Sequence, residues 1–263
     1  MIKVIIHGAQ GRMGREVLRA VCSDAELEAV GAVDIEAIGD RLALPGGAGD
    51  IPLSADLEAI ISTTKPDVMV DFTLHKAAMP AIRTAARHGV NLVIGTTGFS
   101  QQDIDEIDGL SHENGIGAVV ASNFALGAIL MIHMAKTAAK YFDYAEIIEK
   151  HHEKKADAPS GTALSTARAM IEARGKGFTM PSLDKETLAG TRGGQVDGIS
   201  VHSVRMPGYL AHQDVILGAA GQTLKISHDT ISREAFMPGV VMATKRVVDG
   251  KGFFHGLENL LGL

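Results

Sequence analysis

In the first half of the chain, short apolar runs alternate with amphipathic stretches that have helical spacing, as at Val17, Leu18 and Val21. The apolar runs that indicate strands are residues 3–7, 27–33, 67–73, 90–94 and 117–122. The expected helices between the later strands are residues 56–62, 76–88 and 101–110, with a loop over residues 39–52 rich in glycine and proline. Strands that alternate with helices predict an α/β domain with a doubly wound parallel sheet.

The pattern changes in the second half. A helix over residues 124–140 precedes a strand over residues 144–148, and a further helix is expected over residues 163–174. Three strand-like runs then follow without helices between them, at residues 199–206, 214–219 and 223–227. Consecutive strands of this kind favour an antiparallel or mixed sheet, and therefore a second α+β domain.

The last helix is expected over residues 234–248, with Pro238 kinking it or delaying its start. Residues 175–196 are polar, glycine-rich and without a clear period, which predicts a loop. We therefore expect a first domain over residues 1–124, to which residues 233–263 return, and a second domain over residues 125–232.

A glycine-rich turn follows the first strand. Residues 8–14 read Gly-Ala-Gln-Gly-Arg-Met-Gly, with a helical pattern directly after them. In this context Gly8 would form the turn, Gly11 would admit a pyrophosphate, and Gly14 would let the helix pack on the sheet. Asp34 ends the second strand 20 residues after Gly14, where an acidic side chain would bind an adenosine ribose. The spacing is G-x-x-G-x-x-G, so a glycine-rich turn without a nucleotide remains the alternative.

Small and hydroxylated residues follow the other strands of the first half. They include residues 71–73, 95–97 and 122–124. In doubly wound sheets, ligands bind beyond the carboxyl ends of the strands. Because these segments share that edge with the glycine-rich turn, we expect them to admit a nucleotide.

Composition limits the remaining function classes. A net charge of −6 and a pI near 6.0 argue against nucleic-acid and anionic-membrane binding. The single cysteine, Cys22, excludes an intrachain disulfide and fits a reducing cytoplasm. The first strand begins at Ile2, leaving no room for a signal peptide, and the apolar tract at residues 124–134 is too short to cross a bilayer. The scattered histidines have no metal-ligand spacing with a cysteine or carboxylate, so no metal site is expected; they are His112, His202, His212 and His228.

The richest chemistry lies in residues 149–163, which read Glu-Lys-His-His-Glu-Lys-Lys-Ala-Asp-Ala-Pro-Ser-Gly-Thr-Ala. Imidazole is the side chain whose usual pKa lies nearest neutral pH, so His151 and His152 are candidates for proton transfer. Ser160 or Thr162 can cap the helix that follows, and a helix start with nearby lysines suits a carboxylate or phosphate. The segment therefore indicates a pocket for an anionic substrate beside a proton donor. From these residues alone, a solvated basic loop remains the alternative.

Taken together, these motifs resemble the dihydrodipicolinate reductase (4-hydroxy-tetrahydrodipicolinate reductase) family over essentially the whole chain. The resemblance depends on residues 8–14, 71–73, 93–98 and 122–124, and above all on residues 151–162. It implies a Rossmann-like first domain, a second domain that binds substrate and builds a cytoplasmic homotetramer, and reduction of a cyclic imine dicarboxylate by NADH or NADPH on the diaminopimelate route to lysine.

The resemblance also implies roles for individual residues. His151 and Lys155 match the family's two proton-transferring positions, although Lys155 can instead neutralise a substrate carboxylate. The substrate-binding positions that the resemblance implies are His152, Ser160, Gly161 and Thr162. The cofactor-binding positions are Gly8, Ala9, Gln10, Gly11, Arg12, Met13, Asp34, Gly95, Thr96, Thr97, Ser122, Asn123 and Phe124. Because the half-sites lie on different domains, we expect domain closure during the reaction.

Cofactor preference and two rival functions stay open. Asp34 is followed by Ile35 and Glu36, with no adjacent cation to offset a 2′-phosphate, so we expect dual use that favours NADH. The nearer rival is another NAD(P)-dependent imine or amino-acid reductase or dehydrogenase on the same scaffold. The farther rival is a dinucleotide-binding tetramer without catalysis.

Overall fold

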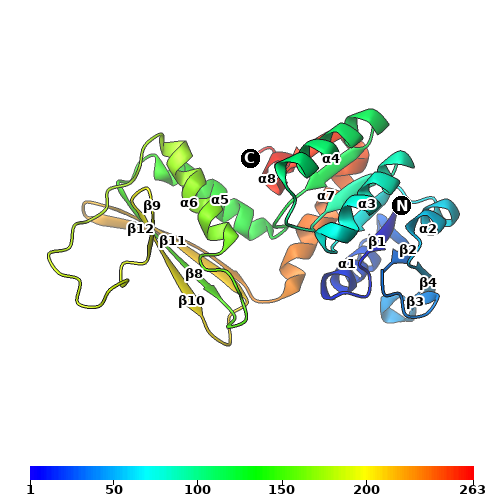
Figure 1. Cartoon of the computed structure of the whole chain (residues 1–263), viewed down its shortest axis with the longest axis horizontal. Helices are drawn as coiled ribbons and strands as arrows, with labels where there is room; N and C mark the ends of the chain where they lie inside the picture. Colours follow the sequence, from blue (N-terminus) through cyan, green and yellow to red (C-terminus); the bar gives the residue numbers. More distant parts are fainter. The chain divides into compact units, whose positions relative to one another are not determined.

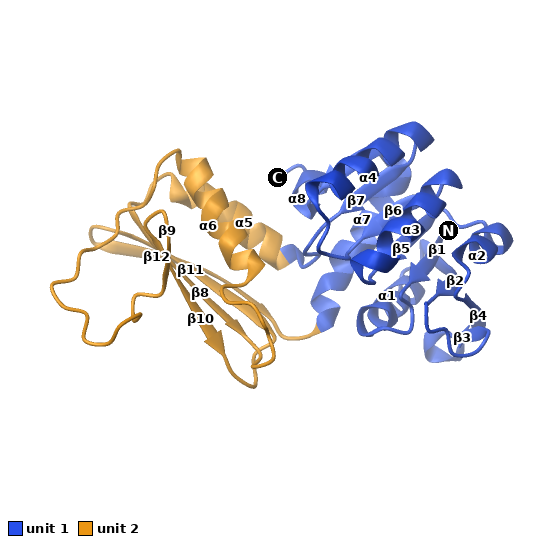
Figure 2. Ribbon diagram, viewed as in Figure 1, with its two compact units in different colours: residues 1–126, 233–263 blue, residues 127–232 orange.

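The computed structural model describes all 263 residues and divides them into two compact units. Unit 1 comprises residues 1–126 and 233–263, and unit 2 comprises residues 127–232 (Figure 2). The boundaries expected from the sequence lie after residues 124 and 232. The chain thus leaves unit 1 after its first 126 residues, builds unit 2 from one continuous segment, and returns.

Unit 1 is built on a sheet in the order β13-β7-β6-β5-β1-β2-β4-β3, with all neighbours parallel except β3 and β4 (Figure 1). Its strands are β1 (Ile2–His7), β2 (Leu27–Val33), β3 (Arg41–Ala43), β4 (Asp50–Ser54), β5 (Val68–Asp71), β6 (Asn91–Ile94), β7 (Gly117–Val120) and β13 (Gly252–His255). Its helices are α1 (Arg12–Ser23), α2 (Leu57–Thr64), α3 (His75–Arg87), α4 (Gln101–Asn114), α7 (Met237–Asp249) and α8 (Leu257–Leu261), with 3₁₀ turns η1 (Pro45–Gly47) and η2 (Arg233–Phe236). This confirms the predicted doubly wound α/β fold.

Local sequence explains where several helices of unit 1 begin. Asp56 caps α2 by accepting from the Ala59 amide at 3.1 Å. Ser100 begins α4 with a capping box, in which its hydroxyl accepts from the Asp103 amide and Asp103 accepts from the Ser100 amide. Pro238 lies in the first turn of α7, where a missing N–H costs nothing, so the proline delays the helix rather than kinking it.

The order of the strands places a topological switch point between β1 and β5. From β1 the chain winds outward through β2, and it then returns to the other side of β1 at β5 before continuing to β6 and β7. At such a point the loops after neighbouring strands turn in opposite directions and leave a crevice at the carboxyl ends. The glycine-rich turn after β1 lies at this point.

One expectation for unit 1 was wrong, and one strand was not predicted. Residues 39–52 are not only loop, because they contain η1 and the small antiparallel pair β3–β4. Ile51 and Leu53 of β4 are buried, but the flanking glycines and prolines hide this short alternation in the sequence. The edge strand β13 was missed, because its four residues begin with a glycine and include only two apolar side chains.

Unit 2 has a mixed five-stranded sheet in the order β12-β11-β8-β10-β9. Its strands are β8 (Tyr144–His151), β9 (Gly194–Val196), β10 (Ile199–Arg205), β11 (Ala211–Ala219) and β12 (Gln222–Thr230), and its helices are α5 (Leu126–Ala139) and α6 (Gly161–Arg174). β8 pairs in parallel with β10 and antiparallel with β11, which confirms the expected mixed sheet.

The core of unit 2 lies between one face of the sheet and the two helices. Met131 of α5 and Met170 of α6 are buried against Ile147 of β8 and Val215 of β11. Figure 2 shows both helices on the same face of the sheet. Met134 lies on the outer side of α5, where its side chain is 49% exposed.

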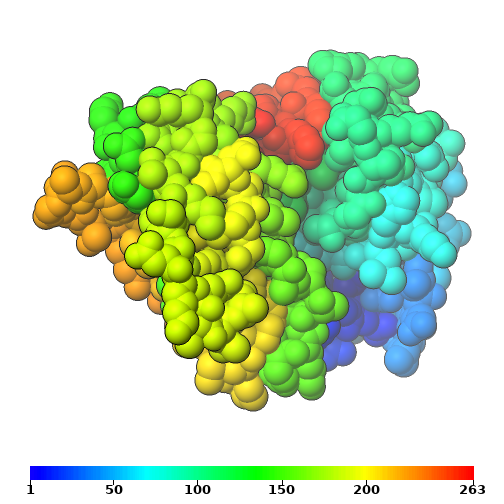
Figure 3. All heavy atoms as spheres, turned by 60° about the vertical axis from the view of Figure 1, so that its left-hand side comes forward, coloured from blue at the N-terminus to red at the C-terminus, as the bar shows by residue number.

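The segment between α6 and β10 is largely irregular, as predicted, although its end forms the short strand β9. Its apolar side chains Met180, Leu183 and Leu188 are exposed. Yellow-green surface atoms in Figure 3 include this part of the chain. None of the helices in the structure has the length and apolar character needed to cross a membrane.

Asp214 is a buried carboxylate of β11 that we expect to control stability in acid. Burial raises its pKa, but hydrogen bonds from Lys150, Ser227 and Lys225 outweigh this and lower the pKa to about 2. A carboxyl whose pKa is depressed in the folded state stabilises that state above its unfolded pKa, and the stabilisation disappears as the pH falls through the folded pKa. The wild type should therefore lose about 2 kcal/mol of unfolding free energy between pH 5 and pH 2 from this residue.

The measurement is urea unfolding of Asp214→Asn and wild type across this pH range. The variant should be less stable at pH 7, and its stability should fall less steeply in acid. Asp184→Asn at an exposed loop position is the matched control and should follow the wild type. Equal acid dependence in all three proteins would contradict the assignment.

Candidate active site

The turn after β1 depends on glycine at two positions. Gly8 has a φ of +81°, and its amide and that of Ala9 donate to the Val33 carbonyl at 2.8 and 3.2 Å. At Gly14, a Cβ atom would lie 2.1 Å from the Gly8 carbonyl oxygen. The turn and the first turn of α1 can therefore pack this closely only because these side chains are absent.

The start of α1 is suited to an anion. Its N-cap is Gly11, which supplies no side-chain acceptor, and the first turn holds no acidic residue. The first amides of a helix have no partner within the helix and carry a partial positive charge. The amides of Arg12 and Met13 can therefore receive a diphosphate without competition from a side-chain cap.

Asp34 lies beside this turn at the end of β2. Its Oδ2 accepts from the Gln10 amide at 3.0 Å, and its Oδ1 accepts from the Glu36 amide at 3.3 Å. The Gln10 side chain bonds both the amide and the carbonyl of Ile38, at 3.0 and 3.3 Å. The structure thus brings Asp34 and the glycine-rich turn together, as the sequence analysis expected.

A buried polar network lies at the ends of β1, β5 and β6. The Asp71 carboxylate is fully buried and accepts from Thr96 Oγ1 at 2.6 Å and Thr73 Oγ1 at 2.8 Å. His7 Nδ1 lies 2.6 Å from the same carboxylate. The Thr73 amide donates to Thr96 Oγ1 at 2.8 Å, which ties the loop after β5 to the loop after β6.

Gly95 and Phe124 are positioned by a second, apolar contact. A Cβ atom on Gly95 would lie 2.0 Å from the Phe72 ring, and the rings of Phe72 and Phe124 are 5.7 Å apart. Among the positions expected to bind the nicotinamide end, Phe124 and Thr96 are buried and satisfied within unit 1. Thr97 and Ser122 are exposed instead, and so they are available to a ligand.

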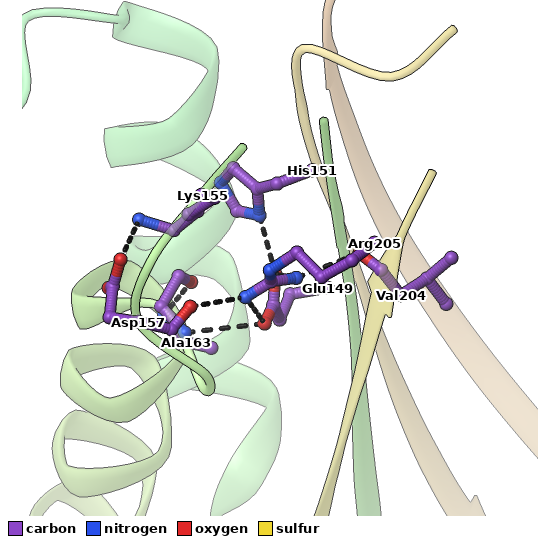
Figure 4. Close-up of polar contacts among 8 residues, drawn as sticks. Glu149, His151, Lys155, Asp157, Ala163, Val204 and Arg205 are labelled. Atoms are coloured by element: carbon purple, nitrogen blue, oxygen red, sulfur yellow. Dashed lines mark hydrogen bonds and ion pairs between the residues drawn. The ribbon is translucent and has the colours of Figure 1, made fainter. Parts of the chain in front are cut away.

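In unit 2, the candidate catalytic histidine is the last residue of β8. His151 and Glu149 are two residues apart, so they share a face of the strand, and Glu149 Oε2 lies 2.5 Å from His151 Nδ1. The register of β10 pairs Arg205 with His151. Arg205 donates to both Glu149 oxygens at 2.7 and 2.9 Å (Figure 4).

The loop after β8 carries the candidate lysine. Lys155 Nζ forms an ion pair with Asp157 Oδ1 at 2.7 Å, and the Lys155 amide donates to the His152 carbonyl at 3.2 Å. Arg205 also donates to the Asp157 carbonyl at 2.7 Å. Figure 4 shows the His151 ring and the Lys155 side chain on the same side of the cluster.

Ser160 connects this cluster to α6. Its hydroxyl accepts from the Ala163 amide at 3.2 Å, which confirms Ser160 as the N-cap, and its own amide donates to Glu149 Oε1 at 3.3 Å. Gly161 is exposed, and a Cβ there would meet no atom within 4 Å. The amides of Gly161 and Thr162 thus begin a helix that has no acidic residue in its first turn. This end of α6 can hold a carboxylate.

Burial, hydrogen bonds and neighbouring charges shift the pKa values of His151 and Glu149. Burial lowers the pKa of His151, Glu149 opposes this shift, and the cations Lys155 and Arg205 reinforce it. Burial would raise the pKa of Glu149, but hydrogen bonds from Arg205, Ser203 and His151 outweigh it, so the pKa is lowered. Both shifts therefore favour an ionised Glu149 beside a neutral His151.

Two residues of these sites, Glu149 and Arg205, were missed by sequence reasoning. Glu149 has a readable signal, because a residue two positions before a strand-end histidine lies on the same face. Arg205 has none, because its place beside His151 depends on the pairing of β8 with β10, more than 50 residues apart. Asp71 was expected at the edge of the sheet where the nucleotide binds. Its buried hydrogen bonds could not be predicted, because their partners follow or end separate strands. The described residues contain no cluster of three or more metal-ligating side chains.

A glycine-rich turn at the switch point of a doubly wound sheet is typical of dinucleotide-binding proteins, a class that includes the pyridine-nucleotide-dependent oxidoreductases. The family described as "Dihydrodipicolinate reductase, N-terminus" matches residues 2–124, and "Dihydrodipicolinate reductase, C-terminus" matches residues 127–261. The chain belongs to the dihydrodipicolinate reductase family.

Individual relatives agree with this assignment. The 4-hydroxy-tetrahydrodipicolinate reductase of Dehalococcoides mccartyi (strain BAV1) is 59% identical over 100% of this chain and 99% of its own length. The enzyme of the same name from Moorella thermoacetica is 50% identical over 99% and 98%. The dipicolinate-bound dihydrodipicolinate reductase from Paenisporosarcina sp. TG-14 has a TM-score of 0.89 and 41% identity, covering 98% of this chain and 99% of that one.

Proposed function

We propose that the protein reduces 4-hydroxy-tetrahydrodipicolinate to tetrahydrodipicolinate, with NADH or NADPH as hydride donor, on the diaminopimelate route to lysine. The observation that carries the proposal is the intact cluster of His151, Lys155 and the α6 start in a chain that matches the reductase family over its whole length. The reaction replaces a ring hydroxyl by hydrogen, so it consumes one hydride and one proton and releases water.

The substrate is a ring with two carboxylates, and unit 2 offers matching groups. The amides of Gly161 and Thr162 receive one carboxylate, and the Lys155 ammonium leaves Asp157 to neutralise the other or to donate the proton. His151 is the second candidate for that proton. A carboxylate bound near the imidazole would raise the pKa of His151, opposing the effect of burial and of the Lys155 charge.

Unit 1 would hold the dinucleotide. The uncapped amides of Arg12 and Met13 would bind its pyrophosphate, and Asp34 would bind its adenosine ribose. The loops after β6 and β7 would contact its nicotinamide end. When bound in reduced form, this cofactor supplies the hydride. Direct transfer requires the reduced nicotinamide to reach the substrate ring beside His151.

The test is an absorbance assay at the reduced-nicotinamide band with freshly generated 4-hydroxy-tetrahydrodipicolinate. Oxidation of the cofactor that depends on this substrate supports the proposal. Turnover only with other cyclic imines or amino acids would favour the nearer rival, and cofactor binding without turnover would favour a non-catalytic dinucleotide-binding protein.

We expect kcat/KM with NADH to exceed kcat/KM with NADPH. The Asp34 carboxylate repels a 2′-phosphate, and its neighbours Ile35 and Glu36 add no cation. Steady-state kinetics with each cofactor measure this ratio. Asp34→Asn removes the repulsion and should shift the ratio toward NADPH, whereas Glu28→Gln, an exposed change within β2, should leave it in place. A preference of the wild type for NADPH would contradict the prediction.

We also propose that the active form is a homotetramer in the cytoplasm, assembled through unit 2. The sheet face opposite α5 and α6 has no helix of its own over it, and it carries the exposed Tyr144 and the partly buried Ile148 and Ile216. Multi-angle light scattering of the purified protein measures the mass. A monomer of 27.6 kDa at micromolar concentration would contradict this proposal.

A further inference from the structure

Glu149 is a charged residue placed in an otherwise apolar row. Along β8, Ala145, Ile147 and Glu149 point to the face that packs against α5 and α6, and all three are buried. The exposed fraction of Glu149 is 0%. Burying a carboxylate is costly unless it is paired and hydrogen-bonded, so a protein without a use for the charge gains by placing an apolar side chain there.

Every partner that the structure gives Glu149 is a donor. Arg205 supplies two bonds, the Ser160 amide supplies one at 3.3 Å, the His151 ring supplies one at 2.5 Å, and the Ser203 side chain supplies another. Beside Arg205 the carboxylate is ionised and can only accept, so His151 Nδ1 must carry the hydrogen in this contact. Nε2 is then the ring nitrogen of His151 left to exchange a proton with a ligand.

We propose that Glu149 is the positioning residue for His151, fixing its ring and its tautomer so that Nε2 faces the reacting substrate. The inference rests on the proposed reductase function, which it deepens. Arg205 extends the same arrangement to the second candidate acid, because it holds the Asp157 carbonyl at 2.7 Å while it holds Glu149. A single buried carboxylate–guanidinium pair thus orients His151 and anchors the loop of Lys155.

The charged groups that face His151 are Glu149 on its own strand, Arg205 on β10 and Lys155 on the following loop. Glu149 is the only anion among them, and it favours the protonated ring. Without its charge, the two cations act unopposed. The pH at which His151 gains its proton should then fall, and the ring should lose its fixed orientation.

The chain provides a matched control on the same strand. Glu146 also accepts from an arginine and a histidine, with Arg192 Nη2 at 2.6 Å and His202 Nε2 at 3.0 Å. Its position in β8 is of opposite parity to Glu149, so its side chain lies on the other face of the sheet. Glu146→Gln therefore removes a similar cluster without touching His151.

The first experiment compares the pH dependence of kcat/KM for wild type, Glu149→Gln and Glu146→Gln. In Glu149→Gln the limb that reports on His151 should move to lower pH by about 1–2 units, and kcat should fall by about 100-fold. KM for the dinucleotide should stay within about twofold, because its proposed residues belong to unit 1. Glu146→Gln should leave the pH of this limb unchanged, because Glu146 does not contact His151, even if the variant alters assembly through its own face of the sheet. Loss of kcat in Glu149→Gln with an unmoved profile would overturn the proposal.

The second experiment reads the tautomer directly and does not depend on a variant of Glu149. Protein labelled with ¹⁵N-histidine is studied by NMR at pH 8, with His151 assigned from the signal lost in His151→Gln. Hydrogen on Nδ1 and a bare Nε2 support the proposal, and hydrogen on Nε2 would overturn it. A wild type without reductase activity but with the Nδ1–H tautomer would instead refute the proposed function and leave the positioning geometry intact.

Discussion

Replacing Lys155 with alanine should lower kcat for 4-hydroxy-tetrahydrodipicolinate by about 10²–10⁴-fold, the usual range for the loss of a general acid. The change removes the ammonium that pairs with Asp157 at 2.7 Å and that either donates the proton or neutralises a substrate carboxylate. Measurement of kcat and KM separately distinguishes these roles. Loss of kcat alone indicates proton donation, whereas a large rise in substrate KM indicates charge neutralisation.

Lys154→Ala is the control for this prediction. Lys154 is the exposed neighbour of Lys155, so its removal changes the net charge equally but should preserve most of the turnover. The dissociation constant of the dinucleotide, measured by fluorescence titration, should be similar in both variants. Near-normal turnover by Lys155→Ala would argue for a different reaction on this scaffold.

Gly14→Ala is expected to destabilise unit 1 by about 1–3 kcal/mol, the usual cost of overpacking a close contact. The added Cβ would lie 2.1 Å from the Gly8 carbonyl oxygen and 2.7 Å from the Ala9 Cα, and both are backbone atoms that cannot rotate away. Either the turn or the start of α1 must therefore shift. KM for NADH should rise in the same variant, because both segments would hold the pyrophosphate.

Urea unfolding measures this effect, with Gly109→Ala as the matched control. Gly109 lies inside α4, and a Cβ there would meet no atom within 4 Å. In a helix interior, alanine is more favourable than glycine by about 1 kcal/mol, so this control should be at least as stable as the wild type. Unchanged stability and unchanged KM for Gly14→Ala would refute the close packing at the turn.

The regular elements of unit 1 were predictable because each carries its own local signal. β2 spans the seven residues expected, since Leu27–Val33 is apolar except for Glu28 and lies between polar segments. β3, β4 and β13 lacked such a signal. Strands of three to five residues near glycines and prolines form because they pair with a neighbouring strand. The local sequence does not show which neighbour that is.

The candidate site divides in the same way. His151, Lys155 and the Ser160 cap lie within ten residues of one another, so the motif shows them together. Residues that contact this motif come from distant parts of the sequence, as Arg205 does from β10. Likewise, the sequence indicated Thr96 and Phe124 as cofactor contacts. Only the packing shows that the Thr96 hydroxyl donates to Asp71 and that the Phe124 ring packs against Phe72.

The return of the chain into unit 1 has a consequence for biosynthesis. β13 closes the sheet beside β7, and α7 packs against β6 and β7, yet both are translated after unit 2. The core of unit 2 needs only residues 127–232, so it can form while the carboxyl-terminal segment is still unmade. On the ribosome, the domain that starts the polypeptide is therefore the one that finishes folding last, with an unpaired β7 edge exposed in the interim.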